Sequence, residues 1–187
     1  MIELNPMDFD ANFEAAQIFE QTDQKLALKF YETGLNIIRH HLKSEEPFKF
    51  MAQWPSCFED PTKHMEVTSK RVPPEILCNY GVLLLSEEGR QQEAMDSLQE
   101  ALKESERLLS QVDKDDTRLK ALVLTLKFNI ARCHEKTSRI GEASDMYKKI
   151  IAEEPRYIDA YLRLAYLARG RGDMRRALEY LDTAKAK

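Results

Sequence analysis

Residues 124–157 read LTLKFNIARCHEKTSRIGEASDMYKKIIAEEPRY, and residues 158–187 continue with IDAYLRLAYLARGRGDMRRALEYLDTAKAK. The small residue Ala143 recurs as Ala177 after 34 residues. Counted from residue 124, Ala131 and Ala143 stand at the eighth and twentieth positions, Tyr147 at the twenty-fourth and Pro155 at the thirty-second. Small residues allow two helices to touch closely, and a proline ends a helix. The stretch therefore predicts a hairpin of two helices.

The second segment repeats this pattern in register. Ala165, Ala177 and Ala184 stand at its eighth, twentieth and twenty-seventh positions, and Gly172-Asp173 falls in the turn between its helices. A 34-residue hairpin with small residues at these positions resembles the tetratricopeptide repeat (TPR). The sequence therefore predicts an all-α fold, a TPR solenoid with a right-handed superhelix, about four hairpins and two insertions.

Two further hairpins are predicted upstream. In the first, Ala27 and Gly34 take the twentieth and twenty-seventh positions, and either Ala15 or Ala16 supplies the small eighth residue. In the second, Gly81 is the eighth residue. From Ala94, its twentieth residue, to Ala143 the spacing is 49, which exceeds the period by 15. We expect the surplus in residues 103–120, as longer helices flanking a turn at residues 113–116.

The repeats divide the chain into five predicted segments. They are residues 1–43, a hairpin with the end of a preceding repeat; 44–72, an insertion; 73–123, a hairpin with an extended charged helical insertion; 124–157, a hairpin; and 158–187, a truncated hairpin. A solenoid must cover its terminal apolar faces, and no polar capping helix is apparent. We therefore expect the chain to be part of a longer array.

Composition agrees with this fold class. The 187 residues contain 28 Lys+Arg and 32 Asp+Glu, a net charge of −4, with 43% hydrophobic residues, 6 Gly and 7 Pro. Few Gly and Pro favour long helices and argue against a β-sandwich or disorder. The mild acidity gives no electrostatic reason to expect direct binding of nucleic acid.

Membrane segments and disulfides are not expected. No apolar run approaches the roughly 18 residues that span a bilayer. The three cysteines, Cys57, Cys78 and Cys133, match neither a disulfide framework nor a zinc pattern, which favours a reducing compartment.

The insertion at residues 44–72 has no helical period and mixes prolines with aromatic residues. Its aromatic anchors are Phe48, Phe50, Trp54 and Phe58. One interpretation is a loop that folds back onto its own helices. The other is a docking element, because aromatic side chains among prolines can anchor a partner.

No catalytic or metal-binding pattern is found. Cys133-His134 lacks a second pair of ligands at zinc spacing. His134 takes the eleventh position of its repeat, where a packed aromatic is usual, so we expect a structural role. There is no Gly-rich phosphate loop or nucleophile elbow. The sequence predicts that the protein is not an enzyme, has no cofactor and takes no small-molecule substrate.

The predicted function is protein binding in a groove lined by the first helices of successive hairpins. The candidate groove residues are Val82, Leu85, Thr125, Phe128, Arg132, Lys136, Leu162, Tyr166 and Arg169. The carboxylate clamp of chaperone-binding TPRs is not complete, because only Asn129 and Arg163 agree with it. This mixed apolar and charged groove suits an extended or helical protein segment.

A basic cluster lies near the last turn of the array. It contains Arg163, Arg169, Arg171, Arg175 and Arg176. One interpretation is a solvated turn. The other is a contact to an acidic partner or to phosphate.

Several runs exceed what generic repeat positions explain. They are VPPEILCNYGVL at residues 72–83, FNIARCHE at 128–135, YKKII at 147–151, EPRYIDAYLRL at 154–164 and AQIFEQTD at 16–23. In collinear order they resemble the TPR scaffold subunits of the RNA polymerase II-associated factor (PAF) complex. The insertion departs from that family.

The resemblance implies a nuclear, non-catalytic scaffold. Its partners would be other PAF complex subunits and, through the complex, the RNA polymerase II machinery, in transcription elongation and histone modification. The alternative is a TPR adaptor of another class, a chaperone or trafficking module that binds a peptide in its concave groove.

Overall fold

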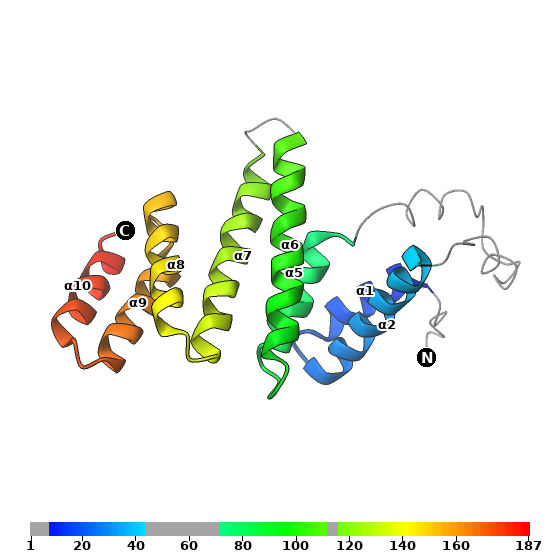
Figure 1. Ribbon diagram of the computed structural model, residues 1–187, viewed down its shortest axis with the longest axis horizontal. Coiled ribbons are helices and arrows are strands. Elements are labelled where there is room, and N and C mark those ends of the chain that lie inside the picture. Colours follow the sequence, from blue (N-terminus) through cyan, green and yellow to red (C-terminus); the bar gives the residue numbers. More distant parts are fainter. Residues whose placement is uncertain (1–7, 44–71, 112–115) are drawn as a thin grey trace, which may run out of the picture. The chain divides into compact units, whose positions relative to one another are not determined.

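The computed structural model describes residues 8–43, 72–111 and 116–187, and all regular secondary structure in them is α-helical (Figure 1). The helices are α1 (Phe9–Phe19), α2 (Gln24–Lys43), α5 (Pro74–Leu84), α6 (Gln91–Gln111), α7 (Thr117–Lys136), α8 (Ile140–Glu153), α9 (Ile158–Gly170) and α10 (Met174–Lys185). The predicted all-α class is confirmed. The chain forms two compact units, residues 1–76 and 77–187, and the division into five segments stays a prediction.

The first unit contains the hairpin of α1 and α2. Asp8 caps α1, because its carboxylate accepts a hydrogen bond of 3.1 Å from the backbone N–H of Ala11. Gly34 faces the ring of Phe13 so closely that a Cβ on the glycine would lie 2.5 Å from it. Both Ala15 and Ala16 are buried. The small residues therefore stand where the two helices approach most closely.

The second unit is built from successive helices that pack on their neighbours, with α6 on α7, α7 on α8, α8 on α9 and α9 on α10. Packing between consecutive elements is typical of a solenoid. One cluster of buried side chains joins α7, α8 and α9. Its members are Ala131, Ala143, Tyr147, Ile150, Ala160, Leu164 and Leu167.

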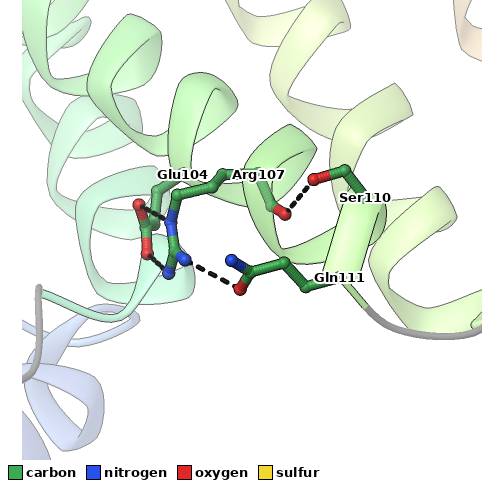
Figure 2. A network of polar contacts seen from close by, with 4 residues as sticks. All are labelled: Glu104, Arg107, Ser110 and Gln111. Atoms are coloured by element: carbon green, nitrogen blue, oxygen red, sulfur yellow. Dashed lines mark hydrogen bonds and ion pairs between the residues drawn. The ribbon is translucent and has the colours of Figure 1, made fainter.

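Helices α6 and α7 are 21 and 20 residues long, so most of residues 103–120 is helical. Asp116 caps α7 by accepting a 3.0 Å hydrogen bond from the N–H of Leu119. Near the end of α6, buried Glu104 forms an ion pair with Arg107, whose Nε lies 2.9 Å from a carboxylate oxygen (Figure 2). Arg107 also donates to Gln111 at 2.8 Å. This pairing compensates the charge of a carboxylate that is largely removed from water.

Gly81 on α5 occupies the predicted close approach to α6. A Cβ at this position would lie 2.7 Å from Cγ of Leu98 and 3.3 Å from the carbonyl oxygen of Ala94. The two helices are also linked here, because the side-chain Oγ of Ser97 on α6 donates a 2.9 Å hydrogen bond to the backbone carbonyl of Leu77 on α5. Glycine is therefore required here because a larger side chain would not fit. Its backbone conformation does not require glycine, because it is helical.

We expect Gly81→Ala to lower the free energy of unfolding. Overpacking against Leu98 costs about 1–3 kcal/mol, which exceeds the gain of up to about 1 kcal/mol in helix propensity. The matched control is Gly141→Ala on α8, where an added Cβ meets nothing within 4 Å. Urea unfolding followed by circular dichroism measures both. Equal stability of the two variants would contradict the close contact.

The turns after α7 and α9 contain equivalent residues in a left-handed conformation. Ser138 has φ of 60° and Gly172, 34 residues later, has φ of 80°. In both turns a backbone N–H returns to the preceding helix, from Arg139 to the carbonyl of His134 at 2.8 Å and from Asp173 to that of Ala168 at 3.0 Å. Left-handed backbone disfavours residues with a Cβ. The backbone of Ser138 is therefore strained, whereas that of Gly172, the equivalent residue of the next repeat, is not.

Ser138→Gly should raise the free energy of unfolding by up to about 1 kcal/mol, since it relieves this strain. The reciprocal change Gly172→Ser should lower it by a similar amount. Thermal unfolding of both variants measures the difference. If both changes shift stability in the same direction, the strain argument is wrong.

Candidate partner-binding groove

The exposed candidates lie on α7 and α9, the first helices of the last two hairpins. Leu162 and Tyr166 are 43% and 53% exposed. Lys136 and Arg169 are also exposed, and Arg132 is half-buried. Leu162 and Tyr166 are four residues apart and Tyr166 and Arg169 three, so these side chains follow one face of α9. The structure places these predicted residues where a partner can reach them.

Two predicted groove residues pack more against the rest of the chain. Leu85 is buried. Phe128 packs toward the core, and its ring centroid lies 5.4 Å from those of both Tyr147 and Tyr157. The assignment of these two as contact residues stays a prediction, and the structure gives them less exposed surface than Leu162 and Tyr166. Repeat position alone does not reveal what the adjacent side chains fill.

The remaining candidates are intermediate or cannot be placed. Val82 on α5 is half-buried, and so is Thr125 on α7, whose hydroxyl donates to the carbonyl of Ala121 at 2.9 Å. The insertion anchors Phe48, Phe50, Trp54 and Phe58 lie outside the described residues. The two interpretations of the insertion both stay open.

An ion pair links α7 to α9 beside the groove. Arg163 Nε lies 3.1 Å from Oε1 of Glu135, and a second nitrogen of Arg163 bonds to the other carboxylate oxygen. The Glu135 side chain is only 9% exposed. Burial lowers the pKa of Arg163, and the positive charge of Arg132 lowers it further. Sequence reasoning assigned Arg163 to the basic cluster but did not pair it with Glu135, although the two stand at positions six and twelve of adjacent repeats.

Tyr166 is flanked by two guanidinium groups. The Cζ atom of Arg163 lies 4.9 Å from the centre of the Tyr166 ring, and that of Arg169 lies 5.4 Å from it. A cation over an aromatic face is attracted by the ring quadrupole. The ring therefore holds two cations beside the exposed part of α9.

Cys78 and Cys133 form no disulfide among the described residues, and both are buried. Burial raises the pKa of Cys133 to about 11, which suppresses the reactive thiolate. Among the described residues, no group of three His, Cys, Asp or Glu side chains could hold a metal ion. None of the helices in the described part of the chain is long and apolar enough to cross a membrane.

His134 faces the turn between α7 and α8, and its Nδ1 atom is buried without a hydrogen-bond partner among the described residues. Burial lowers the pKa of His134, and the positive charge of Arg139 adds to this effect. A folded state that disfavours the protonated ring binds fewer protons than the unfolded state.

The stabilising contribution of neutral His134 should be complete above the ordinary histidine pKa of 6.5 and lost as the pH falls from there toward the lowered folded pKa. We expect His134→Phe to flatten this part of the curve of stability against pH. Urea unfolding at a series of pH values, with the unsubstituted chain as the reference, measures it. Parallel curves would show that His134 does not carry the effect.

Known proteins were compared with this chain first by sequence and then by fold. No family model matches the chain. It is 30% identical over 172 residues to "RNA polymerase-associated protein CTR9" of Caenorhabditis elegans, covering 88% of this chain and 12% of that protein. It is 39% identical over 61 residues to "Protein CTR9 homolog" of Arabidopsis thaliana, covering 33% of this chain and 6% of that protein. The chain thus spans a small part of these relatives, and the predicted resemblance is confirmed.

Solved structures of TPR proteins share the fold. MamA matches with a TM-score of 0.59 at 14% identity, covering 97% of this chain and 79% of that one. The pilus biogenesis factor PilW matches with 0.61 at 18%, covering 97% and 63%. The APC/C assembly Cut9–Hcn1 matches with 0.50 at 15%, covering 97% and 34%. The chain therefore has the predicted TPR solenoid fold.

Proposed function

We propose that this chain, a TPR solenoid similar over 88% of its length to the CTR9 protein of Caenorhabditis elegans, is a non-catalytic scaffold segment. Its surface would hold other subunits of an RNA polymerase-associated complex, in the nucleus, during transcription elongation and histone modification. The observation that carries the proposal is the sequence similarity, because it extends across both compact units.

The exposed surface supports a binding role. Leu162 and Tyr166 are large, largely exposed side chains on the groove-facing helix α9. Exposed apolar groups beside charged ones are typical of surfaces that bind other proteins. Their rigid helical support would reduce the ordering cost of binding.

The chaperone-adaptor alternative is not favoured. Of the two residues that agree with a carboxylate clamp, Asn129 is buried and Arg163 is paired with Glu135. A terminal carboxylate would have to displace Glu135, whose side chain would then remain buried without its ion-pair partner. Such a buried charge is strongly destabilising.

Affinity capture of the full-length protein from nuclear extract tests the proposal. We expect polymerase-associated factors to be recovered, and Leu162→Gln combined with Tyr166→Gln to reduce the recovery of at least one subunit. Ala152→Gln, at an exposed position on α8, is the matched control and should change nothing. Recovery of chaperones or membrane coats without polymerase-associated factors would refute the proposed function.

A further inference from the structure

The net charge of −4 for the whole chain is the sum of an acidic first part and a basic last part of the sequence. Residues 117–187, which form α7 to α10, contain 16 Lys+Arg and 9 Asp+Glu, whereas residues 1–116 contain 12 and 23. The last two hairpins are therefore basic, although the chain as a whole is acidic. Net charge over the chain is no guide to the field at their surface.

Part of this charge lies on α7 and α9, around the ion pair of Glu135 and Arg163. We call Arg132, Lys136, Leu162, Tyr166 and Arg169 the α7–α9 face. No carboxylate lies within ion-pair distance of its three cations among the described residues.

Three carboxylates near this face in sequence do not neutralise it, and one of them, Asp173, four residues after Arg169, pairs with Arg176 at 3.4 Å. The charge of Glu135 is already compensated by Arg163. Asp159 lies in the first turn of α9, ten residues before Arg169. Ten residues correspond to about 15 Å along a helix. The cations of the α7–α9 face are therefore available to charges brought by a partner.

The face is also apolar between its cations. Leu162 and Tyr166 are exposed, and the guanidinium group of Arg169 rests 5.4 Å from the Tyr166 ring. A ligand that matches this surface needs carboxylates and large apolar side chains in alternation. Single-stranded nucleic acid is bound by several aromatic rings along a basic groove, and this face has one aromatic ring, Tyr166.

We propose that the α7–α9 face binds an internal acidic segment of a partner protein, with Asp or Glu side chains on Arg132, Lys136 and Arg169, and large apolar side chains on Leu162 and Tyr166. The inference rests on the proposed scaffold function, because it names the chemistry of a segment that the scaffold would hold. The bound segment does not need to include the partner's C-terminus. Of the two residues that agree with a carboxylate clamp, Asn129 is buried and Arg163 is paired with Glu135.

The test measures fluorescence anisotropy of the 187-residue chain with a labelled, amidated peptide of about 15 residues in which Glu and Asp alternate with Leu and Phe. The control probes are the same peptide with Gln and Asn in place of Glu and Asp, and a single-stranded RNA. We expect binding of the acidic peptide only, and weaker binding as salt rises from about 50 to 300 mM, because salt screens the cations.

The variant Arg132→Glu, Lys136→Glu, Arg169→Glu should weaken binding of the acidic peptide about tenfold or more. Its matched control is Lys149→Glu, Arg156→Glu, Lys185→Glu, which makes the same change of net charge at exposed positions on α8, in the turn before α9 and on α10. The control should stay within about twofold of the unsubstituted chain. A peptide in which Lys replaces the acidic residues should bind the triple variant of the α7–α9 face better than it binds the unsubstituted chain.

Circular dichroism must show equal helicity for both triple variants, and a variant that loses helicity is replaced by the corresponding Gln variant. Equal losses in the two triple variants, or preference for RNA over the acidic peptide, would overturn the proposal. Failure here with continued capture of polymerase-associated factors by the full-length protein would leave the scaffold function standing and reject only the acidic segment.

Discussion

The close contact between the two helices of each hairpin is the constraint on which the rest of the structure depends. At these contacts the chain has glycine or alanine, and at Gly34 and Gly81 even a single methyl group would meet a neighbouring side chain. Ala131 and Ala143 are completely buried at the equivalent contact of the third hairpin. Short interhelical distances let aromatic side chains such as Tyr147 fill the space beside them, and this forms the core that joins α7, α8 and α9.

The same geometry determines which side chains can bind a partner. Because α7 and α9 are neighbouring first helices, Arg163 on α9 forms an ion pair with Glu135 on α7. Each of the two charges is thereby compensated within the chain. Arg132, Lys136 and Arg169 keep their charges available, next to two exposed apolar side chains. The binding character of this surface thus follows from pairing within the solenoid, as much as from the residues that line it.

The hairpins could be predicted from sequence because the constraint is local and, in the last two hairpins, recurs after 34 residues. Small residues at Gly81, Ala143 and Ala177 identify the contacts without knowledge of distant parts of the chain. The site was less predictable. Leu162, Tyr166 and Arg169 are exposed on α9, but Leu85 and Phe128, chosen by the same rule of position, are buried or packed against other rings. Position in a repeat indicates the direction of a side chain, whereas burial depends on the size of its neighbours.

The sequence by itself determined the all-α class, the hairpin period and the resemblance to CTR9 proteins. The first two depend on residue identity at regular spacing, and the third on runs of residues that repeat positions do not explain. Only the tertiary structure decided that Glu135 neutralises Arg163, that Ser138 adopts the left-handed conformation of Gly172, and that Tyr166 stands between two guanidinium groups. These features depend on distances between atoms on different turns and helices. Spacing along the chain specifies which residues can meet, and packing selects which of them do.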